Sequence, residues 1–213
     1  MFADRRQAGQ QLAAALAGRD LGDPVVFGLA RGGVPVAHQV AHGLGGRLEV
    51  AVARKIGAPG QPELGLGAIT SDGPAVYRED TLRALNLTPE DLAETCEAER
   101  REARRRLWLY RGDAPAPAVA GRDVVLVDDG LATGVTARVM LRALRELGPR
   151  SLRLAVPVCA AEAAEELAQE VDEVVCVHRP SHLRAVAFWY DDFHPVSDDE
   201  VLLALAESPT TGK

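Results

Sequence analysis

The chain has 213 residues, of which 47% are hydrophobic and 26% are charged, an ordinary balance for a globular protein. Its formal net charge of −7 argues against a nucleic-acid-binding surface as the main function. No apolar run is long enough to span a membrane, and the first residues lack a secretory signal pattern. Three cysteines without metal-site spacing also fit a reducing compartment, so we expect a cytoplasmic protein whose residues 1–213 form a single domain.

Strand and helix patterns alternate along most of the chain. Apolar strands are predicted at residues 24–29, 48–53, 124–127, 152–158 and 173–177, and helices at residues 4–17, 34–42, 135–147 and 161–170. Ser197 and Glu200 form a capping-box pattern that opens a terminal helix. This alternation predicts an α/β fold with a doubly wound, mainly parallel sheet and with loop sites along one edge.

Residues 56–120 interrupt this alternation, and we predict that they form an insertion. The segment 56–67 is rich in Gly and Pro, which indicates a mobile loop, whereas residues 68–70 and 75–77 could pair as a small β-ribbon. Thr88 and Pro89 are typical of the N-cap and first turn of a helix, and the charged sequence that follows predicts a helix to about Tyr110. Residues 114–120 alternate Ala and Pro and are expected to be a connector.

The most informative stretch is residues 124–136, Val-Val-Leu-Val-Asp-Asp-Gly-Leu-Ala-Thr-Gly-Val-Thr. A buried strand runs into the acidic pair Asp128 and Asp129, and a loop of small residues leads into a helix. Backbone N–H groups at the helix start and the hydroxyls of that loop can hold a phosphate, while its glycines allow a close approach. The acidic pair suits a polyol or a magnesium ion. An ordinary strand-to-helix turn with stabilising charges at the helix start is the alternative, but it leaves the Thr-Gly-x-Thr pattern unexplained.

This stretch resembles the phosphoribosyl-diphosphate (PRPP) loop of type I phosphoribosyltransferases, whose pattern Val-Asp-Asp-x-x-Ala-Thr-Gly-x-Thr it matches. The order of elements over residues 24–158 is similar to that family as well. The resemblance implies a magnesium-dependent transferase that moves the phosphoribosyl group of PRPP to a nitrogenous acceptor such as a nucleobase, releasing pyrophosphate. It also implies that homodimers can form.

Residue roles follow from the resemblance. Asp128 and Asp129 would face the ribose and hold magnesium through water, and Lys55 would join them as a catalytic residue. Binding of PRPP and its phosphates would fall to Arg31, Gly32, Gly33, Arg54, Gly130, Leu131, Ala132, Thr133, Gly134, Val135 and Thr136. A surface turn is the alternative for the Arg-Gly-Gly segment taken alone.

Composition supports a role for Lys55 independently. Of the 24 basic residues 22 are arginines, and the only other lysine is Lys213. A compact ammonium group is well suited to a phosphate, so we interpret this exception as functional, with chance drift as the alternative.

The acceptor and the general base are less well marked. Enzymes of this family that act on 6-oxopurines usually have an aspartate at the position of Ala132, whereas adenine phosphoribosyltransferases have Ala there, as this chain does. Hypoxanthine or guanine is therefore a less favoured acceptor. Glu63 becomes a candidate base, with a solvated loop carboxylate as the favoured alternative. Residues 178–213 would form a hood and terminal helix in which Trp189 or Tyr190 stacks the acceptor; sealing the core is the alternative for both rings.

Residues 97–111 are rich in arginine and occupy the position of the family's catalytic lid, although Glu–Arg pairs on a solvated helix explain most of them equally well. Three other functions stay open: a PRPP-binding regulator without transfer activity, a phosphatase or hydrolase using the same phosphate pocket, and an RNA-binding regulator. The acidic net charge makes the RNA-binding regulator the least favoured.

Overall fold

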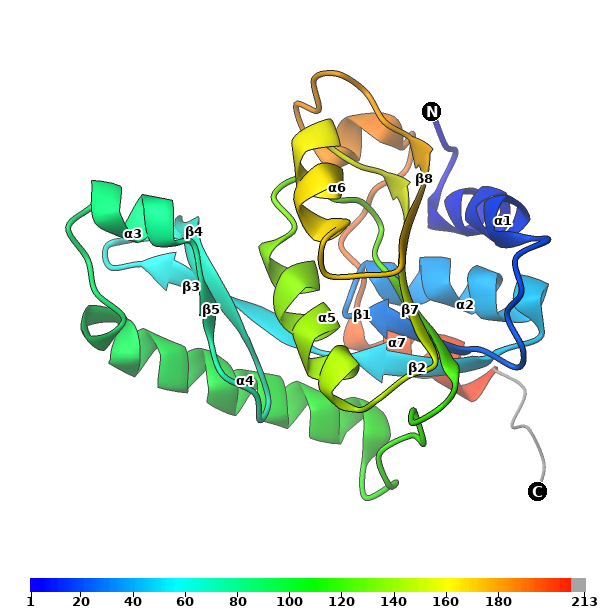
Figure 1. Ribbon diagram of the computed structural model, residues 1–213, viewed down its shortest axis with the longest axis horizontal. Helices are drawn as coiled ribbons and strands as arrows, with labels where there is room; N and C mark the ends of the chain where they lie inside the picture. The colour runs from blue at the N-terminus through cyan, green and yellow to red at the C-terminus, as the bar shows by residue number, and fades with distance from the viewer. Residues whose placement is uncertain (208–213) are drawn as a thin grey trace.

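Five parallel strands form the central sheet of the computed structural model, which describes residues 1–207 except for the side chains of Pro62 and Glu63 (Figure 1). The strands are β1 (Val25–Leu29), β2 (Arg47–Ala51), β6 (Asp123–Val127), β7 (Ser151–Val158) and β8 (Glu173–His178), in the order β2-β1-β6-β7-β8. All residues of β1 and β6 are buried, as expected of apolar, mostly β-branched strands at the centre of a parallel sheet.

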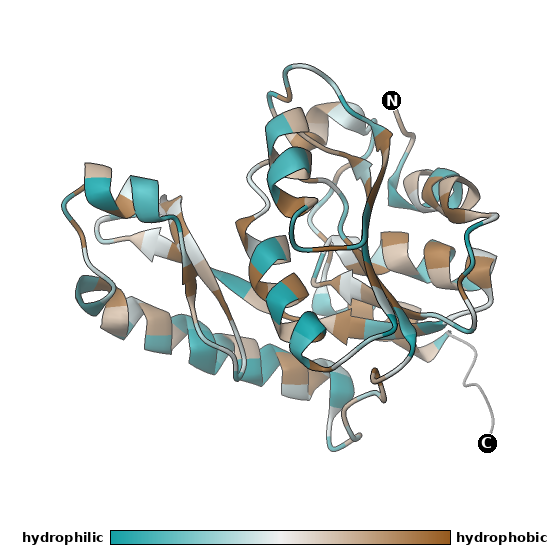
Figure 2. Ribbon diagram, in the orientation of Figure 1, coloured by the Kyte–Doolittle hydropathy of each residue, from teal (hydrophilic) through white to brown (hydrophobic). Residues whose placement is uncertain are grey.

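Helices cover both faces of this sheet, which confirms the predicted doubly wound α/β fold. Because side chains alternate along a strand, Val124 and Leu126 pack with α5 (Val135–Glu146) and α6 (Ala161–Leu167). Val125 and Val127 face the other way, onto α1 (Arg5–Leu16) and α2 (Gly33–Leu44). In Figure 2 the sheet and the inner faces of the helices are largely brown, whereas α5 and α6 turn hydrophilic residues outward.

The order of strands fixes where a ligand can bind. The chain moves from β1 outward to β2, returns to β6 on the other side of β1, and then continues through β7 to β8. The loops after β1 and β6 therefore leave the sheet in opposite directions and open a crevice at its carboxyl edge. Both loops carry residues that the sequence marked for function.

The insertion is more ordered than predicted. Residues 53–58 and 61–70 form β3 (Ala53–Ala58) and β4 (Gln61–Thr70), an antiparallel hairpin extended by β5 (Val76–Tyr77). The prediction of a mobile loop over residues 56–67 is therefore wrong. The predicted ribbon between residues 68–70 and 75–77 is confirmed, because β4 pairs with β5. The Gly- and Pro-rich composition concealed strands whose buried residues Ile56, Leu66 and Ile69 pack on Leu92 and Cys96.

A second correction concerns residues 48–53, which do not form one strand. The chain leaves the central sheet after Ala51 and enters β3 at Ala53, so Arg54 and Lys55 lie within the hairpin and not at the end of a core strand.

The remaining insertion elements are α3 (Glu79–Ala84), η1 (Glu90–Leu92) and α4 (Ala93–Arg111), which runs along the hairpin (Figure 1). The helix predicted up to Tyr110 is confirmed, but Thr88 does not cap it, because the Thr88 hydroxyl donates to the Asp91 carboxylate at 3.0 Å. The short helix α3 was not predicted. None of the helices in the part of the chain that the structure describes is both long and apolar enough to cross a membrane.

The chain ends its described course with η2 (Val186–Trp189) and α7 (Asp198–Ala206). Ser197 accepts a hydrogen bond from the Glu200 N–H, and the Ser197 N–H donates to the Glu200 carboxylate, so the predicted capping box is confirmed.

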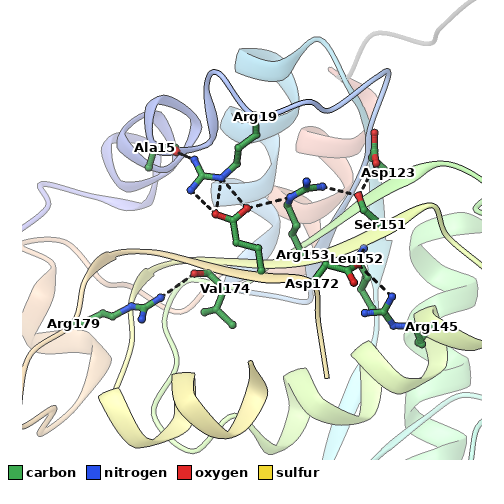
Figure 3. Close-up of polar contacts among 11 residues, drawn as sticks. Ala15, Arg19, Asp123, Arg145, Ser151, Leu152, Arg153, Asp172, Val174 and Arg179 are labelled. Carbon is green, nitrogen blue, oxygen red and sulfur yellow. Dashed lines mark hydrogen bonds and ion pairs between the residues drawn. The ribbon is translucent and has the colours of Figure 1, made fainter. Parts of the chain in front are cut away.

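At the amino edge of the sheet, opposite the crevice, a polar network joins strands to helices (Figure 3). Asp123 at the start of β6 is only 1% exposed, and its carboxylate accepts hydrogen bonds from the Gly22 N–H, the Ser151 hydroxyl and the Arg150 guanidinium. The hydrogen bonds from Arg150 lower the pKa of Asp123, against the effect of burial, so the ionised form stabilises the fold.

We expect Asp123→Asn to lower the free energy of unfolding by about 2 kcal/mol at pH 7, because hydrogen bonds to a buried charged group are lost. A lowered pKa in the folded state gives stability that is present above the unfolded pKa near 4 and lost as pH falls further. Urea denaturation from pH 7 to pH 3 should therefore show the difference between wild type and variant narrowing at the acid end.

The control is Asp113→Asn, since Asp113 is exposed and has no hydrogen bond or ion pair within residues 1–207. An effect of Asp123→Asn no larger than that of the control would contradict a stabilising role for the network.

Candidate active site

A cleft of about 620 Å³ opens at the carboxyl edge of the sheet, between the loop after β1, the end of β6 and the β3–β4 hairpin. It brings the three predicted loops together. The residues marked by the sequence that line it are Arg31, Gly32, Arg54, Lys55, Asp128 and Thr136. Thr95 and Glu99 of α4 also line the cleft, and neither was predicted.

Glycines let the loop after β1 lie directly against the end of β6. A Cβ atom on Gly32 would come within 2.0 Å of Asp129 Oδ2, and one on Gly33 within 2.6 Å of the Val127 carbonyl oxygen. Close packing therefore requires glycine at both positions. Gly33 is also the first residue of α2. The peptide bond between Ala30 and Arg31 is cis.

The acidic pair is asymmetric. Asp128 lines the cleft, and its Oδ1 atom accepts a hydrogen bond from the Asp129 N–H at 2.9 Å. The Asp129 carboxylate instead contacts Arg5 of α1, with the Arg5 Nε atom 2.9 Å from Asp129 Oδ2. The structure thus leaves Asp128 as the carboxylate that faces the cleft.

The pKa values of the two acids are also affected by different neighbours. Desolvation and the negative charge of Asp129 raise the pKa of Asp128 well above its ordinary value, and the positive charge of Lys55 opposes this shift. Desolvation also raises the pKa of Asp129, although Arg5 acts to lower it. A cation placed beside Asp128 would therefore relieve a repulsion that the folded protein retains.

The loop over residues 130–136 connects β6 to α5. Leu131 is held by backbone pairing with the end of β7, because its N–H donates to the Val158 carbonyl and its own carbonyl accepts from the Ala160 N–H. Gly134 adopts a left-handed φ of 69° directly before α5, and no side chain caps that helix. Its first N–H groups are therefore available to an anion, as the sequence suggested.

Other members of this loop face different surroundings. Gly130 lies against Val186, where a Cβ atom would come within 2.4 Å of a Val186 methyl group. Ala132, Thr133 and Val135 line a second hollow of about 660 Å³ between α5, α6 and residues 75–83. Only Thr136 of the loop reaches the first cleft.

The three predicted cations are not equivalent. Arg54 donates to Glu99 at 2.7 Å, and Arg31 lies 3.7 Å from Asp198 at the start of α7. Lys55 is exposed at the cleft, and its ammonium group forms no hydrogen bond or ion pair with the described residues. Lys55 is thus the cation that remains unpaired, which agrees with the compositional argument for it.

Most arginines of α4 form structural contacts. Arg105 and Arg106 pair with Glu102, Arg100 with Glu97, and Arg104 with Asp72 at the turn between β4 and β5. This supports the interpretation of residues 97–111 as a helix with Glu–Arg pairs. The side chain of Glu63, the candidate base, lies outside the described residues.

The aromatic residues expected to stack the acceptor are engaged elsewhere. Tyr190 is 5% exposed, and its hydroxyl donates to the Asp129 carbonyl at 2.6 Å. Trp189 stacks on His178 with ring centroids 5.2 Å apart. Neither ring lines the cleft or the two other hollows beside it. The arrangement therefore favours the alternative in which these rings seal the core.

A magnesium ion fits this donor set only together with a substrate. No group of three or more His, Cys, Asp or Glu side chains able to hold a metal occurs among residues 1–207. Magnesium is commonly held by one or two carboxylates plus phosphate oxygens and water. Asp128, which lines the cleft, is the residue that would provide that carboxylate.

Comparisons with known proteins agree with the fold. A family model described as the phosphoribosyl transferase domain matches residues 4–191. Two Mycobacterium tuberculosis proteins (strains CDC 1551 and H37Rv) named as candidate phosphoribosyl transferases are each 42% identical over 208 residues, 96% of this chain and 46% of theirs. The chain thus spans about half the length of these curated relatives. The crystal structure of TT1426 from Thermus thermophilus is 45% identical, with a TM-score of 0.81 over 97% of this chain and 98% of that one.

We expect Asp128→Asn to stabilise the protein when no ligand or metal is bound. Because the pKa of Asp128 is raised in the folded state, the folded protein binds more protons than the unfolded chain, and its stability falls as pH rises above about 4. The variant lacks this loss, so by pH 8 it should be roughly 1 kcal/mol or more harder to unfold. Urea denaturation in chelator at pH 5 and pH 8 measures the difference.

Asp129→Asn is the matched comparison. It also removes a carboxylate whose pKa is raised by burial, but it leaves the buried Arg5 without its counter-ion, a loss of about 3 kcal/mol for a buried pair. Because this loss is the larger effect, the variant should be less stable than wild type. If Asp128→Asn destabilised the protein at both pH values, the repulsion within the acidic pair would be refuted.

Proposed function

Because this chain belongs to the phosphoribosyl transferase domain family, we propose that it transfers the phosphoribosyl group of PRPP to a nitrogen atom of an acceptor, releasing pyrophosphate. The proposal extends to magnesium as the required ion and to a nucleobase-like acceptor. One observation carries it: the cleft places an unpaired cation, a carboxylate and an uncapped helix start around one space. A sugar with a phosphate at one end and a diphosphate at the other fits that order of charges.

The residues divide the work as follows. The N–H groups at the start of α5 and the Thr136 hydroxyl bind the terminal phosphate. Asp128 accepts hydrogen bonds from the ribose hydroxyls and stabilises the positive charge that builds on the ring as its bond to pyrophosphate lengthens. Lys55 neutralises charge that gathers on the departing pyrophosphate.

Magnesium, when bound, would neutralise diphosphate charge and orient the leaving group. Asp128 would hold it, with substrate oxygens and water as further ligands. The raised pKa of Asp128 without a ligand supports this assignment, because a divalent cation at that carboxylate favours its ionised form.

The acceptor site is proposed in a hollow of about 320 Å³ lined by Ala132, residues 160–162 and residues 181–184. Ala132 belongs to the phosphate loop, which links this hollow to the proposed phosphate site. Its polar side chains, Glu162, Ser181, His182 and Arg184, offer hydrogen-bond donors and acceptors to a nitrogenous ring. No aromatic residue other than His182 is among those that line it.

The decisive assay measures pyrophosphate release from PRPP and magnesium with a panel of nucleobases and simple amines. Turnover with one class of acceptor supports the proposal. PRPP binding without any turnover would favour a regulator, and hydrolysis of sugar phosphates without an acceptor would favour a phosphatase.

In that assay we expect Lys55→Gln to lower turnover about 100-fold, since Lys55 is the one lysine or arginine lining the cleft, among the described residues, whose side chain has no ion pair, and we assign it to the leaving group. Lys55→Arg should retain part of the activity, because it keeps the charge but not the compact ammonium group. Equal turnover of wild type and Lys55→Gln would remove Lys55 from the mechanism.

A further inference from the structure

An arginine far from the acidic pair in sequence holds one of its carboxylates. Arg5 is 8% exposed, and both its Nε and one of its terminal nitrogens lie 2.9 Å from Asp129 Oδ2. The other terminal nitrogen donates to the His194 carbonyl at 2.8 Å. Arg5 thus joins α1, the end of β6 and the C-terminal segment in one buried contact.

Residues near the start of the chain and residues 189–194, which precede α7, keep Arg5 in place. The Phe193 ring covers the guanidinium, with 3.9 Å between the guanidinium carbon and the ring centroid. Phe2, which is fully buried, donates its N–H to the Trp189 carbonyl and accepts from the Asp191 N–H. We call residues 2–5 and 189–194 the clasp.

The clasp also fixes the backbone of the acidic pair. The Tyr190 hydroxyl donates to the Asp129 carbonyl at 2.6 Å, so Asp129 is held both at its side chain and at its main chain. On the opposite side Gly32 leaves room for Asp129 Oδ2 only because it has no Cβ atom. Asp129 therefore has little freedom to move.

We propose that Arg5 is a positioning residue of the active site: by binding the Asp129 carboxylate from behind, it sets the direction in which Asp128 faces the cleft. This inference rests on the proposed function. Arg5 does not line the cleft and so acts through Asp129 and not by touching the substrate. The sequence of the phosphate loop gives no indication of this role, because Arg5 lies 124 residues away from Asp129.

The physical consequence of losing Arg5 follows from charge. Without the guanidinium, the Asp129 carboxylate has no counter-ion in a poorly solvated place beside Asp128. It would have to turn toward water, which the cleft supplies, and it would then displace Asp128 from the sugar side. Binding of PRPP should weaken, whereas pyrophosphate, which the loop after β1 and Lys55 bind, should be less affected.

Calorimetric titration with PRPP and, separately, with pyrophosphate, both in magnesium, tests this inference. We expect Arg5→Gln to weaken PRPP binding roughly 10- to 100-fold, the usual cost of removing a residue that orients a ligand-binding group. Pyrophosphate affinity should change little. The matched control is Arg6→Gln, since Arg6 is exposed on the same helix and its side chain forms no hydrogen bond or ion pair within the described residues.

A double-mutant cycle separates positioning from general weakening of the fold. If Arg5 acts through Asp129, Arg5→Gln should lower PRPP affinity far less in an Asp129→Asn background than in wild type. Should Arg5→Gln fail to fold, Arg5→Lys provides the same comparison, because it keeps the charge but not the paired nitrogens.

The outcomes are distinct. Unchanged PRPP affinity in a folded Arg5 variant, or equal losses for PRPP and pyrophosphate, would overturn the positioning role alone. Absence of PRPP binding by the wild-type protein would overturn the proposed function and the positioning role with it.

Discussion

Two neighbouring carboxylates at the carboxyl end of the central strand β6 impose the main constraint on this structure. Like charges this close, with little water around them, repel strongly, and burial disfavours their ionised forms further. The protein meets the constraint with cations from opposite directions. Arg5 approaches Asp129 from α1, whereas Lys55 of the β3–β4 hairpin acts on Asp128 from the cleft side.

The β3–β4 hairpin determines where the Lys55 ammonium group lies relative to Asp128. Arg54 and Lys55 both line the cleft, but successive side chains on a strand leave it in opposite directions, so the two cations have different neighbours. Arg54 turns to Glu99 on α4, and this pair ties the hairpin to its covering helix. Lys55 pairs in register with Ala68, and its ammonium group stays unengaged at the cleft. A structural use for one basic residue thus leaves the other for the ligand.

The sequence predicted the central part of the fold well, because its signals are local. The apolar run at residues 124–127, the acidic pair and the small loop after it indicate a strand, a turn and a helix start, and parallel topology then brings such loops to one edge. The hairpin was missed because residues 56–67 have the composition of a loop, and their strand pairing depends on burial against α4. Arg5 could not be found, because nothing near Asp4–Ala17 indicates a contact with Asp129. The rings of Trp189 and Tyr190 were visible as a cluster, but only packing shows that they close the core.

The clasp also shows that a site built on β6 depends on residues far from it in sequence. Arg5 and Tyr190 both contact Asp129, and Phe2 pairs with the backbone of Trp189 and Asp191, so the two parts of the clasp are joined by the contacts that hold the acidic pair. A protein optimised for stability alone would not keep Asp128 beside Asp129, because an amide in place of Asp128 would avoid the repulsion. That the fold nevertheless encloses both acids, and recruits a buried arginine to hold one of them, is the pattern expected where stability is given up for chemistry. Under the proposed function, the cation that accompanies the diphosphate would compensate the charge of Asp128, so the same burial that disfavours the ionised carboxylate would favour binding of that cation.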